Sequence, residues 1–256
     1  MVFFNYKGKK IFFEIKEAKS RNVIIFLHGS GGDSNTWKNQ FNIKNSYSII
    51  SLDLPSHGNS DRFEKLSLDL YVDVLKKFLD SNDYERVILC GHSLGGAVIQ
   101  SYYFKYPEEV TALILMSTGA KLRVSPAILD ALKRDYDIYL KQLNKVAFSN
   151  NTTNSIIEDY RDQSSLIGAE VTYYDFKICD NFNMFEETNL IEAPCLIICG
   201  TDDKLTPVKY SKYFHDKIRN SKLALIENAG HMVISIKKIR SIIRYRYIRK
   251  RKNMYL

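Results

Sequence analysis

The sequence predicts an α/β protein with a mostly parallel central sheet, helices on both of its faces and an additional helical insertion. Three observations support this prediction. Short aliphatic runs recur along the chain, each is followed by a turn and then by a stretch with helical spacing, and one interval of nearly eighty residues lacks a convincing strand. A chain of 256 residues can form one such domain around a single core.

The predicted strands begin with the segment MVFFNYKGKKIFFEIK. It alternates apolar and polar side chains, which is typical of a hairpin rather than of a signal peptide. Six later runs have the length and aliphatic content of strands that are buried on both faces, as in a parallel sheet. They are residues 23–27, 47–52, 86–90, 110–116, 195–199 and 222–226.

The predicted helices lie between these runs, where apolar residues recur with helical spacing. This spacing predicts helices at residues 67–82, 95–106 and 207–218. The alternation of strands and helices indicates a doubly wound sheet with right-handed crossovers.

The interval between residues 116 and 195 breaks this alternation. Its apolar spacing predicts helices at residues 126–148 and 153–167, separated by the loop NNTTN. The insertion could be an extra crossover layer, or it could be a cap over the carboxyl edge of the sheet, where open α/β sheets bind ligands. The motifs described below favour the cap, to which we assign residues 119–189, with residues 1–118 and 190–256 forming the core domain.

The charge of the chain is unevenly distributed. Its formal net charge is +8, but nine of the 37 Lys and Arg residues and none of the 29 Asp and Glu residues lie in residues 237–256. The rest of the chain is therefore nearly neutral, which gives no electrostatic reason to expect a nucleic-acid partner. No apolar run approaches the roughly 18 residues of a membrane span, so we also expect no membrane partner.

The four cysteines lie mostly within apolar runs. They are Cys90, Cys179, Cys195 and Cys199. We interpret them as small core residues rather than as metal ligands or disulfides. This interpretation fits a reducing, cytoplasmic location.

A candidate nucleophile is found in GHSLG at residues 91–95. This G-x-S-x-G segment directly follows a predicted strand and directly precedes a predicted helix, which is the context that the motif requires. So sharp a turn places the serine in a sparsely populated backbone conformation and exposes its hydroxyl at the amino end of a helix. The pattern predicts Ser93 as the nucleophile.

A serine hydroxyl needs a base to remove its proton. His231, in the segment NAGH, follows the last predicted strand and should lie at the same edge of the sheet as Ser93. The other four histidines fit this role less well, because they adjoin the serine, brace glycine-containing turns or lie in a charged helical stretch: His92, His28, His57 and His215. We therefore predict His231 as the base.

The histidine in turn needs a carboxylate to orient it. Two adjacent aspartates follow the predicted strand at 195–199 in the segment GTDDKLTP, and their side chains should point in different directions. We favour Asp203 as the acid, and expect Asp202 to be solvated or to bond the turn.

Acyl transfer also needs N–H donors for the developing oxyanion. The glycine-rich segment HGSGG at residues 28–32 closes the first predicted parallel strand. The backbone N–H groups of Ser30 and of Leu94, which follows the nucleophile, are the natural pair. A phosphate-binding loop is the alternative interpretation, but the G-x-x-x-x-G-K-[ST] pattern is absent from the sequence.

Together the motifs resemble the α/β-hydrolase superfamily, in its small capped-esterase branch. They are HGSGG, DLPSHGNSD, GHSLGG, GTDDKLTP and NAGHM, in this order, and the resemblance covers roughly residues 2–233. It implies the α/β-hydrolase fold, a substrate pocket between sheet and cap, and no metal or organic cofactor. The acid of the family commonly stands three residues after the strand-ending glycine, which matches Asp203.

The expected activity is hydrolysis of a small carboxylic ester through an acyl-enzyme intermediate. The same triad also serves C–C bond hydrolases, lactonases and thioesterases, which stay open. Haloalkane dehalogenases and epoxide hydrolases resemble this pattern but use aspartate at the position of Ser93. A ligand-binding protein that has lost catalysis on the same scaffold is the non-enzymatic alternative.

The C-terminus departs from the family pattern. Such proteins usually continue with an acidic residue, a proline and a closing helix, whereas this chain ends ISIKKIRSIIRYRYIRKRKNMYL. Ile236, Ile239, Ile243 and Tyr247 could form the apolar stripe of a closing helix with a basic outer face. The alternatives are a tail that binds a membrane surface or nucleic acid, and an altered reading frame of an A+T-rich gene.

Overall fold

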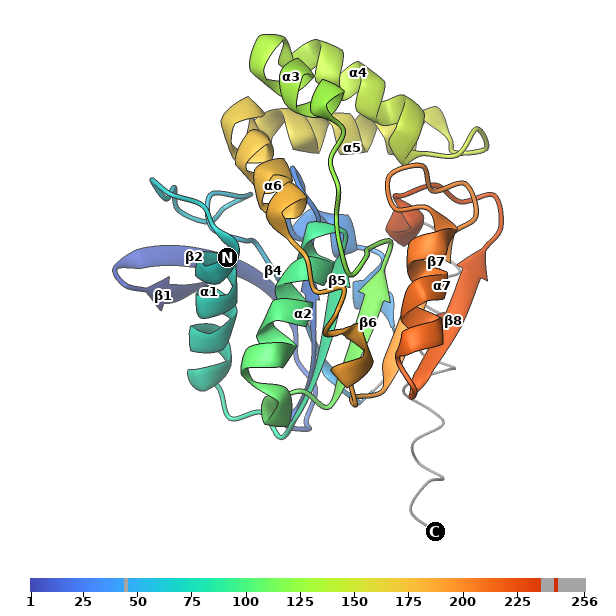
Figure 1. The fold of residues 1–256 in the computed structure, drawn as a ribbon. Coiled ribbons are helices and arrows are strands. Elements are labelled where there is room, and N and C mark those ends of the chain that lie inside the picture. Colours follow the sequence, from blue (N-terminus) through green and yellow to red (C-terminus); the bar gives the residue numbers. More distant parts are fainter. Residues whose placement is uncertain (44–45, 236–241, 244–256) are drawn as a thin grey trace.

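A computed structural model describes residues 1–43, 46–235 and 242–243 of the chain (Figure 1). Its centre is one eight-stranded sheet with the strand order β1-β2-β4-β3-β5-β6-β7-β8. The strands are β1 (Val2–Tyr6), β2 (Lys9–Lys16), β3 (Asn22–Leu27), β4 (Ser48–Leu52), β5 (Arg86–His92), β6 (Ala112–Met116), β7 (Cys195–Gly200) and β8 (Ser221–Ile226). The predicted hairpin is confirmed as β1 and β2, which pair antiparallel, and β2 also runs antiparallel to β4. All other neighbouring strands are parallel.

The central strands are buried on both faces, as their aliphatic content predicted. In β3, Val23, Ile25 and Leu27 contribute to the core on one face of the sheet, whereas Ile24 and Phe26 contribute to the core on the other. The last strand differs from this expectation. Because β8 forms an edge of the sheet, it is only partly buried, and Leu225 is exposed on it.

Helices cover the two faces of the sheet unequally in the described residues. One face packs against α1 (Leu68–Asp80), α2 (Leu94–Lys105) and α7 (Val208–Lys217), of which α1 and α2 lie side by side in Figure 1. Their fully buried aromatic side chains include Tyr71, Tyr102 and Phe214. The opposite face packs against the 3-10 helices η1 (Ser34–Trp37) and η5 (Val233–Ser235). The predicted α/β fold with a mostly parallel sheet is confirmed.

The predicted closing helix falls largely outside the described residues, which exclude Ile236, Ile239 and Tyr247. Ile243 is described, and its side chain is fully buried in the core on the η1 and η5 side of the sheet. The chain after residue 235 therefore contributes at least one apolar side chain to that core.

Four helices interrupt the core between β6 and β7. They are α3 (Pro126–Arg134), α4 (Tyr136–Ala147), α5 (Asn154–Ile167) and α6 (Ala169–Asn181). We call residues 126–181 the helical insert. In Figure 1 it lies above the ends at which the parallel strands terminate, so it faces the edge that carries the candidate catalytic loops.

The insert differs from the sequence prediction in two places. The single helix expected at residues 126–148 is divided at Asp135, whose extended backbone ends α3 and whose carboxylate caps α4 by accepting the N–H of Ile138. Helix α6 was not predicted. It begins after Gly168, whose φ of 89° separates it from α5.

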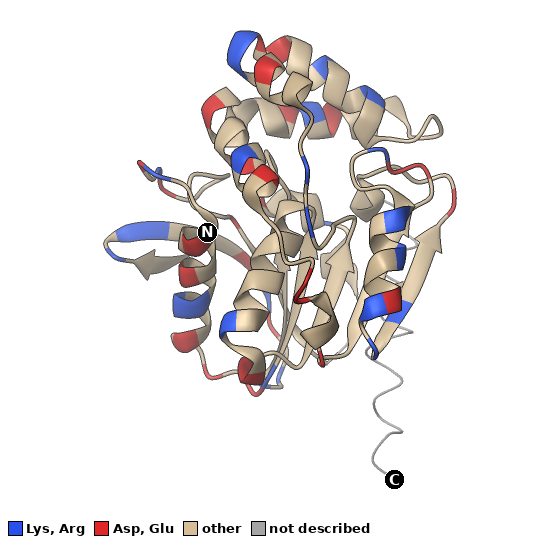
Figure 2. Ribbon diagram, in the orientation of Figure 1, with Lys and Arg blue, Asp and Glu red and all other residues tan. Residues whose placement is uncertain are grey.

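The charged residues are mixed over the fold. Figure 2 shows basic and acidic positions interspersed along the helices of the core and of the insert. Among the described helices, none has the length and apolar character needed to cross a membrane.

Candidate active site

Ser93 lies at a strained turn between β5 and α2. Its φ of 51° and ψ of −114° place it in a sparsely populated region, as the motif predicted. The turn requires glycine on both sides, because a Cβ at Gly91 would lie 2.2 Å from the Gly95 carbonyl oxygen. A Cβ at Gly95 would lie 2.3 Å from the carbonyl oxygen of Leu27 on the neighbouring strand. The local sequence therefore presents the Ser93 side chain at the amino end of α2.

Asp203 and His231 are brought together from two loops at the same edge of the sheet. His231 Nδ1 lies 3.0 Å from Asp203 Oδ2 and 3.1 Å from Oδ1, and each residue is only 5% exposed. Because the carboxylate can only accept, His231 Nδ1 donates to it. Nε2 is then the unprotonated nitrogen of the neutral ring, and among the described residues it has no protein partner.

Further hydrogen bonds hold the Asp203 carboxylate in place. The N–H groups of Leu205 and Thr206 donate to Oδ1 over 3.0 and 2.8 Å, and Thr206 Oγ1 donates to Oδ2 over 2.9 Å. Burial alone would raise the pKa of Asp203, but the charge of His231 and these donors outweigh it and lower the pKa below its ordinary value. Asp203 is therefore held as an anion beside the imidazole.

Asp202 has a different environment, as its predicted role requires. Its side chain is exposed and accepts a hydrogen bond from Thr201 Oγ1. Of the two adjacent aspartates, only Asp203 contacts His231.

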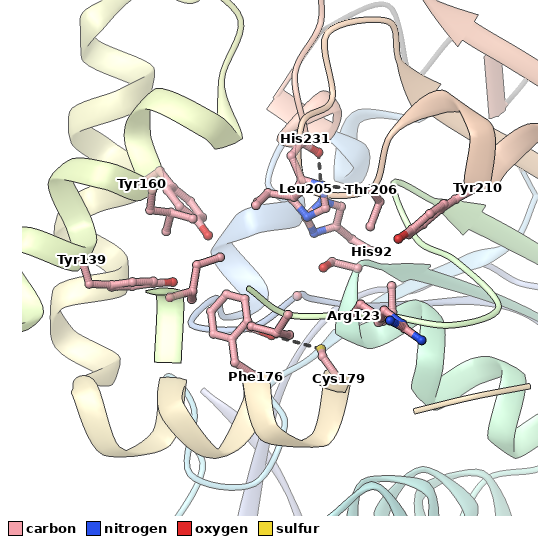
Figure 3. Close-up of a pocket in the computed structure, with 17 residues that line it drawn as sticks. His92, Arg123, Tyr139, Tyr160, Phe176, Cys179, Leu205, Thr206, Tyr210 and His231 are labelled. Atoms are coloured by element: carbon pink, nitrogen blue, oxygen red, sulfur yellow. Dashed lines mark hydrogen bonds between the residues drawn. The ribbon is translucent and has the colours of Figure 1, made fainter. Parts of the chain in front are cut away.

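Ser93 and His231 line one cavity, shown in Figure 3. In the described part of the chain, Ser93 Oγ and the His231 ring do not form a hydrogen bond. Such bonds are often long in unliganded enzymes and shorten when substrate binds. The arrangement thus places a hydroxyl and an imidazole on the wall of one cavity, and the carboxylate of Asp203 holds Nδ1 of that imidazole.

The glycine-rich segment lies directly beside the serine. A Cβ at Gly29 would lie 3.1 Å from Ser93 Cβ, so the segment approaches the nucleophile closely. Among the described residues, the N–H groups of Ser30 and Leu94 donate to no protein acceptor, which leaves both available for a ligand oxygen. The two N–H groups predicted as oxyanion donors are free on the segments that border Ser93.

His92 has a role that the sequence did not reveal. Its side chain is buried, and Nε2 donates to the backbone carbonyl of His231 over 3.0 Å. Burial, reinforced by the nearby His231, lowers the pKa of His92 to about 3, so the ring is neutral. His92 supports the His231 loop through this hydrogen bond. The only sequence signal for this role was that His92 is adjacent to Ser93.

The cavity wall is mainly apolar and comes from both the core and the insert. All four insert helices contribute side chains to it, among them Ile128, Tyr139, Leu143, Tyr160, Phe176 and Cys179. In Figure 3, Tyr139, Tyr160 and Phe176 extend toward the centre of the cavity, opposite His231.

Three other aromatic side chains do not line the cavity. Trp37 is fully buried against Phe26 in the core, and Phe148 packs on Tyr160. The Tyr136 hydroxyl donates to the carbonyl of Ser164 within the insert.

The four cysteines are free thiols and buried. Burial raises the pKa of each thiol above its ordinary value. Within the described ranges, no group of three or more His, Cys, Asp or Glu side chains is arranged to hold a metal ion.

This chain is similar in sequence and in structure to known hydrolases. A sequence model of the alpha/beta hydrolase family matches residues 24–235. A protein named putative esterase/lipase 2, from Mycoplasma genitalium, is 28% identical over 240 residues, which cover 86% of this chain and 85% of that protein. A 2-hydroxy-6-oxononadienedioate/2-hydroxy-6-oxononatrienedioate hydrolase from Paraburkholderia phymatum is 26% identical over 233 residues, with coverages of 82% and 81%. A solved structure of a thermophilic esterase superposes with a TM-score of 0.86 at 34% identity and covers 98% of each chain.

Proposed function

This chain belongs to the α/β hydrolase family, and from that premise we propose that it cleaves small carboxylic esters through an acyl-enzyme intermediate on Ser93. The family and its esterase branch, predicted from five sequence motifs, are confirmed by the family match and by the similarity to the thermophilic esterase. The chain is a hydrolase that acts on ester bonds. The roles of individual residues and the substrate are our proposal.

The buried contact between His231 Nδ1 and Asp203, beside a cavity that also reaches Ser93, is the observation that carries the proposal. Because Nδ1 keeps its proton and donates it in a hydrogen bond to the Asp203 carboxylate, the lone pair of the ring is on Nε2. Nε2 is therefore the proposed base toward the cavity. The second ring nitrogen of His231 has no protein partner among the described residues and is open to the cavity, as a catalytic base requires.

The proposed reaction has two halves. Ser93 Oγ attacks the ester carbonyl while His231 Nε2 takes the hydroxyl proton, and collapse of the tetrahedral intermediate expels the alcohol, which receives that proton. Water then attacks the acyl group on Ser93 with His231 again as the base. The carboxylic acid leaves and the Ser93 hydroxyl is restored.

The developing oxyanion is the second requirement. The free N–H groups of Ser30 and Leu94 are the proposed donors, and one such donor contributes on the order of 10²–10³ in rate. Leu94 lies in the first turn of α2, where the helix dipole also favours negative charge.

We propose that the insert acts as a cap, with residues 119–189 forming the cap domain and residues 1–118 and 190–256 the core. The support is that all four insert helices line the cavity that contains Ser93 and His231. The apolar wall then selects the acyl group, while the catalytic groups come from the core.

The size of the cavity favours a short acyl group. Its volume is about 60 Å³, on a scale where one water molecule needs about 10–15 Å³. It therefore accommodates only a few carbon atoms without movement of the insert. We expect kcat/KM for nitrophenyl esters to be highest at two to four acyl carbons and to fall about tenfold or more at eight.

The test of the proposal uses Ser93→Ala with nitrophenyl butyrate. Loss of the nucleophile should lower kcat/KM by about 10⁴-fold or more, and labelling by a fluorophosphonate probe should disappear. Ser101→Ala is the matched control, because Ser101 is a buried serine on the same helix and its hydroxyl makes no hydrogen bond among the described residues. Ester turnover that persists in Ser93→Ala would contradict the proposal.

The same experiment separates the alternatives. A purely ligand-binding protein would bind the ester without turnover and would not react with the probe. Thioesters, lactones and C–C substrates share the Ser93 chemistry, and a panel of matched substrates ranks them by kcat/KM.

A further inference from the structure

One face of helix α6 lies on the glycine-rich turn beside Ser93. Thr172, Asp175 and Cys179 recur on this face at helical spacing. A Cβ at Gly31 would lie 3.2 Å from Thr172 Oγ1, and Ser30 Oγ lies 3.6 Å from Cys179 Sγ. The insert therefore contacts the turn that supplies a candidate oxyanion donor.

The conformation of this turn depends on one peptide plane. The Gly32 N–H donates to the Gly29 carbonyl over 3.1 Å, which makes Ser30 and Gly31 the two central residues. The φ of 65° at Gly31 is typical of a type II turn, which differs from type I by a flip of the central peptide. The Ser30–Gly31 peptide can therefore point its N–H to either side of the turn unless something holds it.

Asp175 holds this peptide. Its side chain is 0% exposed, and Oδ2 accepts the Gly31 N–H over 3.1 Å. A flipped peptide would turn the Ser30 carbonyl oxygen toward the carboxylate, where two negative partial charges repel each other. The carboxylate thus selects one of the two orientations.

Two further donors hold the Asp175 carboxylate itself. Tyr71 Oη donates to Oδ1 over 2.8 Å, and His57 Nε2 lies 2.9 Å from Oδ2. His57 Nδ1 lies 3.0 Å from the carbonyl oxygen of Pro55, which can only accept. His57 is therefore anchored by the core at one nitrogen and faces Asp175 with the other.

The charge state of His57 agrees with this arrangement. Burial alone would lower the pKa of His57, but the charge of Asp175 and its hydrogen bond outweigh burial and raise the pKa above its ordinary value. A protonated ring donates from both nitrogens. The Asp175 carboxylate of the insert is thereby paired with the His57 cation of the core, and the same carboxylate oxygen contacts the turn through the Gly31 N–H.

We propose that Asp175 is a positioning residue for the oxyanion hole: by holding the Gly31 N–H, it anchors the turn from Gly29 to Gly32 and so fixes the position, relative to the substrate, of the Ser30 N–H that this turn carries. The inference rests on the proposed function, which places Ser30 N–H in the hole. Its consequence is that α6 must be seated on the core for the hole to be complete. The insert then contributes to catalysis as well as to the wall of the pocket.

A merely structural role for Asp175 would give a different result. It would lower stability and leave the active site of the folded molecules intact. A positioning role weakens the binding of a tetrahedral adduct more than the binding of a planar ligand, because the oxyanion hole fits the tetrahedral oxyanion.

The experiment compares a trifluoromethyl ketone, which forms a tetrahedral adduct with Ser93, with the planar amide analogue of the substrate. In Asp175→Ala we expect the ketone to bind about 30-fold more weakly and kcat to fall by a similar factor. The amide should bind within threefold of wild type. Asp175→Asn keeps the shape and one accepting oxygen and should restore most of the loss, to within three- to tenfold of wild type.

Tyr71→Phe is the matched control, because it removes a buried hydrogen bond to Asp175 Oδ1 and leaves the Oδ2 bond to Gly31 in place. Because one donor to the carboxylate is lost, its ketone affinity should fall by about threefold, which is clearly less than in Asp175→Ala, at a lowered melting temperature. Equal weakening of ketone and amide in Asp175→Ala, or equal ketone losses in Tyr71→Phe and Asp175→Ala, would overturn the proposal. Where Asp175→Ala does not fold, Asp175→Asn decides, and a change below twofold in ketone affinity overturns it.

The failure of this inference is distinguishable from failure of the proposed function. If Ser93→Ala abolishes ester turnover while Asp175→Ala retains wild-type kcat and ketone affinity, only the positioning role is wrong. If Ser93→Ala retains turnover, the proposed function itself is wrong.

Discussion

Two histidine–aspartate pairs are buried in the described part of this molecule, and they differ in what surrounds the histidine. Asp203 contacts His231 over 3.0 Å, and Asp175 contacts His57 over 2.9 Å. In the first pair, the second ring nitrogen faces a cavity that also reaches Ser93. In the second pair, the other nitrogen donates to the Pro55 carbonyl.

The comparison shows that the free nitrogen separates a candidate base from a structural cation. A base must release and accept a proton during turnover, so one nitrogen must be open to the substrate. His57 has both nitrogens occupied and its pKa is raised by Asp175, so its proton is held. The two pairs use the same side chains for opposite purposes.

The largest expected effect separates the two histidines by activity. His231→Ala should lower kcat/KM for nitrophenyl butyrate by about 10⁴-fold or more, because the proposed proton acceptor is lost. His57→Gln should lower kcat/KM by less than about 30-fold, because His57 acts only through Asp175. Steady-state kinetics on both variants decide, and comparable losses would refute the distinction between the pairs.

The next effect separates the two adjacent aspartates. Asp203→Asn should lower kcat by about 10³–10⁴-fold, because an amide no longer holds the required tautomer of His231. In Asp202→Asn, kcat should stay within about twofold of wild type, since the Asp202 side chain is exposed and accepts a hydrogen bond from Thr201. A larger loss in Asp202→Asn than in Asp203→Asn would reverse the assignment.

Stability should separate His57 from a histidine on the surface. His57→Gln should lower the free energy of unfolding by about 3 kcal/mol, because it leaves the buried Asp175 carboxylate without its cationic partner. Urea unfolding measures this difference. His215→Gln is the control, because His215 is exposed and bonds only Ser221 among the described residues, and it should change stability by less than about 0.5 kcal/mol.

The smallest effect is the pH dependence of that stability difference. The pKa of His57 is raised in the folded protein, by Asp175 and also by Asp53. The pair therefore contributes fully below the unfolded pKa of about 6.5, and its contribution is lost as pH rises through the folded pKa. The stability gap between wild type and His57→Gln should be wider at pH 6 than at pH 9, and a gap that widens with pH would show that His57 is neutral.

Local patterns predicted most of the fold. Aliphatic runs such as residues 23–27 became strands because short runs of this length and composition are stable when they are buried on both faces of a parallel sheet. Where the prediction differed, a tertiary or local contact decided. Asp135 capped a new helix inside a continuous apolar spacing, and β8 was exposed because it forms the edge of the sheet.

For the candidate site, the sequence by itself determined which residues stand at the sheet's carboxyl edge. Ser93, Asp203 and His231 each follow a strand, and parallel strands end at one edge, so their proximity follows from order along the chain. Gly91 and Gly95 also indicate the sharp turn at Ser93, because a side chain at either position would clash with the backbone.

Only the tertiary structure decided which side chains act through others. Asp175 lies 118 residues from His57 and 144 from Gly31. The sequence around Asp175 contains no pattern that predicts hydrogen bonds from its carboxylate to both residues. His57 and His231 each stand beside glycine in the sequence, yet one is enclosed and the other faces a cavity. The physical reason is that a hydrogen bond depends on distance and direction in space, which local propensity does not encode when the partners lie on different layers of the fold.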